Sequence, residues 1–202
     1  DTIVDTPDMP EALRDSFIRK AQDHVQRICS LLNDISTITH LDEAGNKIPT
    51  TEVDYHDLAY KVSNDLETSG INGNLSFVYD IPLDCTVNGN YTLLSNMLLN
   101  LIRNAAAYSH GSEIKLRLIN ETAKYYTFSF ADNGVGVPQE HIPHLFERFY
   151  RVDTGRSRKV GGTGLGLPIV KNTITTLGGT ISVRNGAAGG LEFVFTLPKW
   201  EQ

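Results

Sequence analysis

The sequence predicts an α/β protein: a two-layer sandwich with a mixed sheet, preceded by a long helix of the kind found in bundles. Three observations predict this class. Segments with helical and with strand periodicity alternate after residue 54. The last two strand segments flank the glycine-rich turn NGAAGG, which indicates a hairpin. Residues 10–41 instead carry one continuous helical pattern. Interleaved elements of this kind favour a sheet that is covered by helices on one face.

The first element is a helix that we place from Pro10 to Leu41. Its apolar residues recur at alternating spacings of three and four, which creates one apolar stripe. The stripe consists of Ile18, Ala21, Val25, Ile28, Leu32 and Ile35, widened by Phe17, Leu31 and Ile38. A stripe this rich indicates packing in a helical bundle. Because Gly45, Asn46 and Pro49 end the helix, we divide the chain into a helical segment at 1–44, a linker at 45–53 and a globular domain at 54–202.

The globular domain alternates helices and strands. A helix is expected from Tyr55 to Thr68, then a strand from Leu75 to Ile81 in which alternate residues are apolar, then a strongly apolar helix from Leu93 to Tyr108. The remaining elements are strands at Glu113–Ile119 and Tyr125–Ala131, a helix starting near Pro138, a loop at Arg151–Thr163, a helix at Leu165–Leu177, and strands at Thr180–Arg184 and Leu191–Leu197.

Composition excludes several classes of protein. The 202 residues carry a net charge of -6, whereas a nucleic-acid binder usually shows a basic face that neutralises phosphates, so we expect no nucleic-acid partner. No apolar run approaches the roughly 20 residues of a membrane span, and the first residues lack a signal-peptide pattern, so we expect a cytoplasmic location without membrane contact. Cys29 and Cys85 lack metal-ligand spacing, and both are expected to be reduced packing residues.

Two asparagines four residues apart, Asn100 and Asn104, are the first candidates for chemistry. They project from one face of the apolar helix in the run NMLLNLIRNAAAYS. An amide oxygen can coordinate a hard cation, and Mg²⁺ that is held by few protein ligands completes its octahedron with water and substrate phosphates. The alternative is that both amides cap or cross-link the fold.

The segment DNGVGVP, from Asp132 to Pro138, places a carboxylate at the end of a strand and two glycines after it. Such a carboxylate can accept a hydrogen bond from the exocyclic amine of adenine, and the glycines allow a flat ring to approach the backbone. Asp-Asn-Gly is also common turn chemistry, so a plain turn is the alternative.

The segment GGTGLGLPIV, from Gly161 to Val170, is a glycine-rich loop that leads into a helix. Exposed backbone N–H groups and the helix dipole make such a junction an anion site. The segment is neither a Walker loop nor a dinucleotide fingerprint, and a flexible hinge is the alternative.

An aromatic segment, LFERFYR, lies between these two glycine-containing segments. Phe146, Phe149 and Tyr150 are expected to anchor a loop that contains the cations Arg156, Arg158 and Lys159. These cations either close over phosphates or form a solvated surface.

In their order and spacing, the four segments resemble the N, G1, F and G2 boxes of the catalytic domain of sensor histidine kinases. The resemblance covers roughly residues 50 to 200. The helix before it resembles the second helix of the dimerisation and histidine-phosphotransfer hairpin of the same family. The resemblance implies the Bergerat ATP-binding fold, which gyrase, Hsp90 and MutL ATPases share.

The resemblance also implies a role for each matching residue, with ATP and Mg²⁺ as cofactors. Asp132 would bind the adenine amine, Tyr108 would pack against adenine, and Gly134 and Gly136 would shape the floor of the pocket. The catalytic residues would be Asn100 and Asn104, which bind Mg²⁺ and the phosphates that it bridges. The residues that line the triphosphate would be Gly162, Thr163, Gly164, Leu165 and Gly166, and those that hold the lid would be Phe146 and Phe149.

The same resemblance implies an acceptor histidine followed by an acidic residue and a proline. None of the six histidines begins that motif; they are His24, His40, His56, His110, His141 and His144. We therefore expect the acceptor helix to lie outside this chain, and this chain alone not to phosphorylate itself. The implied partners are a cognate response regulator and a second copy of the parent protein, bound through the helical hairpin. The parent is expected to be anchored in the inner membrane.

Ala107 departs from the family pattern, in which a lysine or arginine directly before the tyrosine commonly reaches the phosphates. Arg103 is expected to point elsewhere, so the lid cations are the expected substitutes. A catalytically inactive, nucleotide-binding signalling scaffold therefore stays open. An ATPase of the gyrase, Hsp90 or MutL kind would carry glutamate in place of Asn100, and an anti-sigma serine kinase would lack the leading helix.

Overall fold

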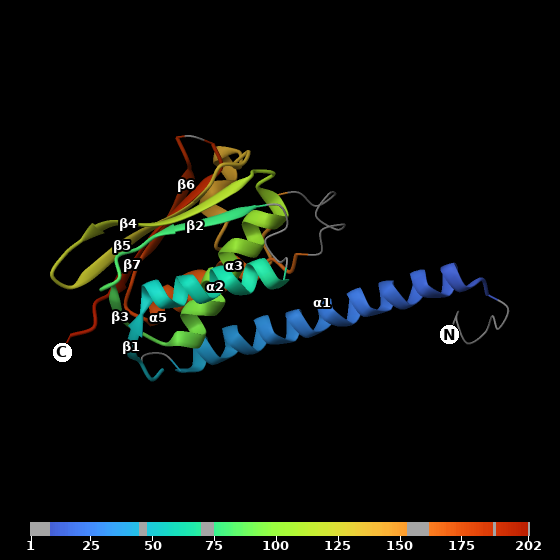
Figure 1. The fold of residues 1–202 in the computed structure, drawn as a ribbon, viewed down its shortest axis with the longest axis horizontal. Coiled ribbons are helices and arrows are strands. Elements are labelled where there is room, and N and C mark those ends of the chain that lie inside the picture. The colour runs from blue at the N-terminus through green and yellow to red at the C-terminus, as the bar shows by residue number, and fades with distance from the viewer. Residues whose placement is uncertain (1–8, 45–47, 70–74, 153–161, 188, 202) are drawn as a thin grey trace.

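The computed structural model describes residues 9–44, 48–69, 75–152, 162–187 and 189–201. A long N-terminal helix runs beside a globular α/β body (Figure 1). The elements are, in chain order, α1 (Glu11–Ala44), β1 (Thr51–Asp54), α2 (Tyr55–Ser69), β2 (Ser76–Asp80), β3 (Thr86–Gly89), α3 (Tyr91–Tyr108), β4 (Glu113–Glu121), β5 (Tyr125–Asp132), the 3₁₀ helix η2 (Gln139–His144), α5 (Gly166–Thr176), β6 (Ile181–Asn185) and β7 (Leu191–Pro198). None of the described helices is long and apolar enough to span a membrane.

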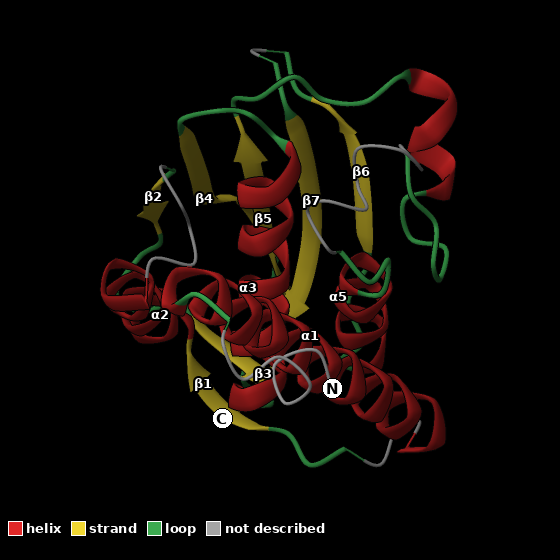
Figure 2. Ribbon diagram, turned by 90° about the vertical axis from the view of Figure 1, so that its right-hand side faces the viewer, coloured by secondary structure: helices red, strands yellow, loops and turns green. Residues whose placement is uncertain are grey.

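Five strands form one mixed sheet in the order β2-β4-β5-β7-β6. β2 runs parallel to β4, whereas every other pair in this sheet is antiparallel, including the expected hairpin of β6 and β7. The helices α2, α3 and α5 cover one face of the sheet (Figure 2). This arrangement confirms the predicted α/β sandwich with a mixed sheet.

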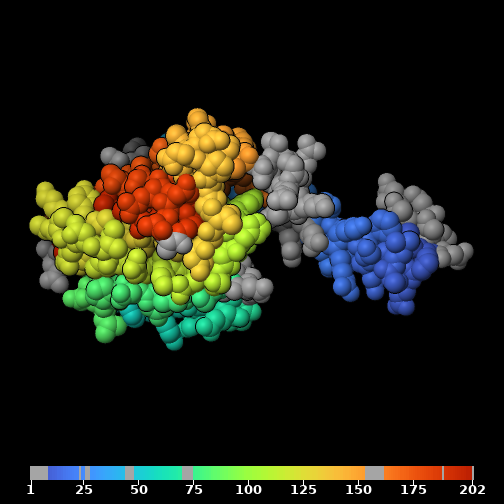
Figure 3. Space-filling view, turned by 90° about the horizontal axis from the view of Figure 1, so that it is seen from above, coloured from blue at the N-terminus to red at the C-terminus, as the bar shows by residue number. Residues whose placement is uncertain are grey.

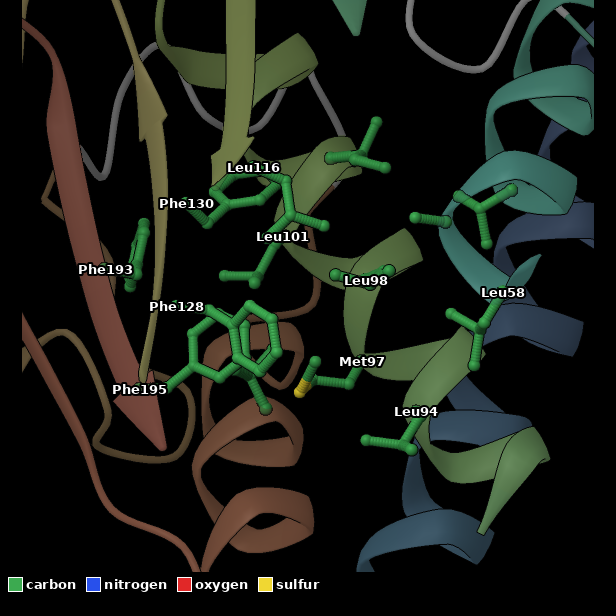
Figure 4. Close-up of a cluster of buried hydrophobic side chains, with 14 of the residues drawn as sticks. Leu58, Leu94, Met97, Leu98, Leu101, Leu116, Phe128, Phe130, Phe193 and Phe195 are labelled. Carbon is green, nitrogen blue, oxygen red and sulfur yellow. The ribbon is translucent and has the colours of Figure 1, made fainter. Parts of the chain in front are cut away.

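The core lies between the sheet and α3 (Figure 4). It is built from side chains that are at most 1% exposed: Phe128, Phe130, Phe193 and Phe195 from the sheet, and Leu94, Met97, Leu98 and Leu101 from α3. The four α3 residues form an apolar stripe along the helix. Burial of this stripe against the sheet provides the main driving force for packing and fixes the rotation of α3 about its axis. As a result, Asn100 and Asn104 lie half-buried at the border of the apolar stripe of α3, the helix that packs beside α5.

Two short strands were missed because each is four residues long and has its partner far away in the sequence. β1 pairs with β3 in an antiparallel ladder, with Val53 opposite Val87. β1 therefore begins inside the segment 45–53 that we expected to be a linker and ends at Asp54, and its pairing joins that segment to the globular body. The expected helix near Pro138 forms instead as the 3₁₀ helix η2, which contains Pro143. A proline lacks the N–H that a longer α-helix requires.

Among the residues that the structure describes, the helix α1 packs on the body through its C-terminal part. The apolar residues of the predicted stripe that lie N-terminal to this part are 42–61% exposed; they are Ile18, Val25, Ile28, Leu32 and Ile35. By contrast, Ile38 and Leu41 are buried. The N-terminal part of the helix extends away from the body (Figure 3). The expectation that both cysteines pack in the interior is wrong for Cys29, which is exposed on α1, whereas Cys85 is buried.

Candidate functional site

The turn after β5 is ordered around the carboxylate of Asp132. This side chain is 7% exposed, and its oxygens accept the backbone N–H groups of Gly134 at 2.9 Å and Leu191 at 3.2 Å. Gly134 passes directly against the end of α3, because a Cβ atom there would lie 2.0 Å from the carbonyl oxygen of Ser109. The same carbonyl accepts the N–H of Val135 at 2.9 Å. The turn is therefore bound to the C-terminal end of α3, which carries Tyr108.

Two asparagines that the sequence analysis did not single out also hold this turn. The Oδ1 of Asn133 accepts the N–H groups of Ser112 and Glu113 at 2.8 and 3.0 Å. The side chain of Asn185, at the end of β6, makes two hydrogen bonds to the backbone of Val137, at 3.0 and 2.8 Å. Nothing local in the sequence marks Asn185, since it lies 48 residues from its partner.

The glycine-rich loop brings α5 beside α3. A Cβ atom at Gly162 would lie 2.1 Å from the hydroxyl of Tyr108, and one at Gly166 would lie 3.4 Å from Oδ1 of Asn100. The loop therefore runs along α3 from its C-terminal end toward Asn100. Eight residues of α-helix span about 12 Å, so the strip between Tyr108 and Asn100 is long enough for an extended ligand.

The loop is also bound to the aromatic segment that precedes it. Gly164 has a positive φ of +73°, and its carbonyl accepts the N–H of Phe149 at 2.9 Å. Phe146 packs edge-on against Phe193 of the sheet, with 6.3 Å between the ring centroids. Phe149 is 67% exposed, and its backbone N–H makes the hydrogen bond to the loop.

The lid cations Arg156, Arg158 and Lys159, together with Gly161, lie outside the described residues. Their expected contact with phosphates stays a prediction.

Asn100 and Asn104 have the chemistry that a Mg²⁺ site requires. No hydrogen bond between described residues involves either side-chain amide. Within the described part of the chain, no group of three or more histidine, cysteine, aspartate or glutamate side chains could hold a metal. Amide oxygens with few other protein ligands fit a Mg²⁺ ion that takes its remaining ligands from water and phosphates.

The helix α1 reaches the same loop, which the sequence analysis missed. The hydroxyl of Thr163 donates a hydrogen bond to Oδ2 of Asp34 at 3.1 Å, across 129 residues. Burial raises the pKa of the Asp34 carboxyl, against the opposing effects of the Thr163 hydrogen bond and the charge of Arg103. The direction of the Arg103 side chain relative to the phosphates stays a prediction.

Comparison with known proteins agrees with the resemblance to sensor histidine kinases. The family described as histidine kinase-, DNA gyrase B-, and HSP90-like ATPases matches residues 89–201. The chain is 31% identical over 189 residues to the sensor protein kinase WalK of Staphylococcus haemolyticus strain JCSC1435, covering 92% of this chain and 31% of that protein. The WalK protein of Staphylococcus saprophyticus is 30% identical over 189 residues, with the same coverage. The chain thus spans about a third of the length of these relatives.

Solved structures share the fold. The catalytic domain of histidine kinase ThkA, in a nucleotide-free form, is 26% identical with a TM-score of 0.62, over 75% of this chain and 99% of that one. The histidine kinase AdeS of Acinetobacter baumannii is 24% identical with a TM-score of 0.71, over 98% of this chain and 88% of that one. Full-length ShkA in complex with AMPPNP is 24% identical with a TM-score of 0.75, over 98% of this chain and 42% of that one.

Proposed function

The chain belongs to the family of histidine kinase-, DNA gyrase B- and HSP90-like ATPases, and on this basis we propose that it is the ATP-binding kinase core of a two-component sensor histidine kinase. The core would transfer the γ-phosphate of ATP to a histidine outside this chain, for relay to an aspartate of a cognate response regulator. The observation that carries the proposal is the approach of the glycine-rich loop to α3, with Gly162 against Tyr108 and Gly166 against Asn100.

Adenine would bind at the C-terminal end of α3. Asp132 supports this assignment because two backbone N–H groups orient its carboxylate and leave further lone pairs that can accept the adenine amine. Tyr108 is 39% exposed beside Gly162, so its ring is available to pack against the base. Gly134 and Gly136 would form the floor, because a side chain at either position would collide with its neighbours.

The triphosphate would extend along the loop toward Asn100 and Asn104. These two asparagines would hold Mg²⁺, whose charge would offset the negative charge of the phosphates. Backbone N–H groups of the loop and the start of α5 would bind phosphate oxygens, since a helix N-terminus favours anions; the loop residues are Gly162, Thr163, Gly164, Leu165 and Gly166. Phe146 and the backbone of Phe149 would hold the lid on the opposite side of the loop.

The domain would contribute position and charge to the reaction, and not a covalent intermediate. A loose phosphoryl transition state is stabilised mainly by alignment and by fixed charges around the transferred group. The nucleophile would be the acceptor histidine of the parent protein, so this chain alone would bind Mg-ATP without phosphorylating itself.

The partners would be the response regulator and a second copy of the parent protein. The exposed apolar residues of α1, such as Val25 and Leu32, support an association through a helical hairpin. The parent would be anchored in the inner membrane, with this part of it in the cytoplasm.

The test is to incubate the chain with radiolabelled ATP and Mg²⁺, first alone and then with the acceptor helix of the parent protein supplied as a peptide. Acid-labile label on the peptide, and none on the chain alone, is expected. Label on the chain alone would contradict the assignment of the acceptor to another segment.

A second candidate is a nucleotide-binding signalling scaffold without catalysis. Ala107 favours it, because this position offers no cation to the phosphates. Nucleotide binding without label on the supplied helix would support the scaffold. Another ATPase of the same fold is disfavoured by Asn100, where such an enzyme would need a glutamate as general base.

A further inference from the structure

The start of α5 already has an anion beside it, and that anion comes from α1. The N–H of Leu165, directly before the first turn of α5, donates to Oγ1 of Thr163 at 3.1 Å. The same hydroxyl donates to Oδ2 of Asp34 at 3.1 Å. The hydroxyl of Thr163 thus links the carboxylate of Asp34 to a backbone N–H of the glycine-rich loop, where phosphates are proposed to bind. A helix N-terminus favours negative charge, so Asp34 takes part of the role that a phosphate would have there.

The contact belongs to a larger interface between α1 and the body, in which α1 lies beside α5 (Figures 1 and 2). Ile38 of α1 is buried against Leu165 and Ile169. One turn farther along α1, the carboxylate of Asp42 accepts two hydrogen bonds from Nη2 of Arg148 at 2.8 and 2.7 Å. Asp42 also accepts a hydrogen bond from Asn172 of α5 at 3.3 Å. Docking of α1 therefore positions the carboxylate of Asp34 at the loop.

We propose that Asp34 is a specificity-determining residue of the nucleotide site, which disfavours ATP relative to ADP while α1 is docked on α5. The inference rests on the proposed nucleotide-binding function. ATP brings one more phosphate, and so more negative charge, to the loop than ADP does. That charge repels the Asp34 carboxylate and competes with it for the Thr163 hydroxyl and for the positive charge of Arg103. It also competes with Oγ1 of Thr163 for the N–H of Leu165.

The reverse effect follows by linkage. If docked α1 lowers the affinity for ATP by some factor, ATP lowers the stability of the docked state by the same factor. ATP would thus favour release of α1 from α5 more strongly than ADP, and the two nucleotides would set different positions of the helix.

The experiment measures the affinities of the chain for Mg-ATP and Mg-ADP by isothermal titration calorimetry at one salt concentration. The variant Asp34→Asn keeps the shape of the side chain and removes its charge. We expect the ratio of ATP to ADP affinity to rise by about fivefold or more, which is the lower end of typical couplings between sites. The variant Asp42→Asn weakens the second contact of the interface and is expected to raise the same ratio by a smaller factor.

The matched control is Asp15→Asn, which makes the same charge change on the exposed N-terminal part of α1. Its ratio of affinities should equal that of the parent chain. A rise in the Asp15→Asn variant equal to that in Asp34→Asn would overturn the proposal, because a general effect of net charge would then explain it.

The calorimetric results separate the role of Asp34 from the proposed nucleotide-binding function. If both nucleotides bind and the ratio is unchanged in Asp34→Asn, the role of Asp34 is wrong and the proposed function stays. If the chain binds neither nucleotide, the proposed function fails and the role of Asp34 fails with it. As an independent readout, hydrogen exchange in residues 34–43 of α1 should increase more with Mg-ATP than with Mg-ADP. Equal exchange with both nucleotides would contradict the linkage.

Discussion

Replacing Asp132 with asparagine is expected to weaken adenine-nucleotide binding strongly while the chain stays folded. Each carboxylate oxygen now accepts one backbone N–H, from Gly134 and from Leu191. An asparagine offers only one oxygen, so one of these two backbone N–H groups faces an NH₂ group that cannot accept a hydrogen bond, and the adenine amine loses its charged acceptor. A hydrogen bond to a charged group contributes about 1.5–3 kcal/mol. The affinity for Mg-ATP and Mg-ADP should therefore fall by about ten- to a hundredfold.

The same reasoning predicts a modest loss of stability. One backbone N–H that loses its acceptor in this buried turn costs about 1–3 kcal/mol. For a chain of this size, the unfolding midpoint should fall by roughly 5 °C. Calorimetric titration and thermal unfolding measured on the same samples separate the two effects. The matched control is Asp80→Asn, which makes the same change on an exposed residue at the end of β2. An Asp132→Asn chain that binds Mg-ATP within twofold of the parent would remove Asp132 from the site.

Three further predictions concern other parts of the molecule. Gly162→Ala places a Cβ atom 2.1 Å from the flexible end of Tyr108, so nucleotide affinity should fall with little change in the unfolding midpoint; a midpoint lowered as much as in a core variant would refute this. Phe195→Ala removes a fully buried ring, and denaturant unfolding should show that the free energy of unfolding falls by about 3–5 kcal/mol; a fall below about 1 kcal/mol would contradict the close packing of this ring in the core. Burial and nearby acidic groups raise the pKa of the Cys85 thiol to about 12. Near pH 8 the reactive thiolate of Cys85 is therefore almost absent, and thiol reagents should modify only Cys29, which is exposed. The thiolate fraction of Cys85 grows only as the pH approaches that pKa, and labelling of two thiols in the folded chain at pH 8 would be the contrary result.

The sequence alone was sufficient for the family and for much of the fold. Four segments in a fixed order identified the family of the nucleotide-binding domain, and the family match confirms it. Long elements with a clear apolar period were predicted within a few residues, as for α3 and β7. These elements can be predicted locally, because apolar residues on the buried face of a helix or strand recur in the sequence with the period of that element. The roles of the individual site residues in binding and catalysis stay predictions.

The sequence was less informative where a contact joins distant residues. The four-residue strands β1 and β3 are too short to show a period, and they pair with each other across more than 30 residues of sequence. Likewise, the support that Asn185 gives to the turn at Val137 has no local signature.

The helix α1 shows most clearly what the sequence determined and what only the tertiary structure determined. Its apolar stripe, read from the sequence, predicts a helix that needs partners, and much of that stripe is exposed in the structure. Only the tertiary structure placed Asp34 at the glycine-rich loop and Asp42 on Arg148, across 129 and 106 residues. An acidic residue beside an apolar stripe looks like any solvated charge in the sequence. Its partner is set by how the whole helix docks, which depends on the combined burial of residues from α1, α3 and α5.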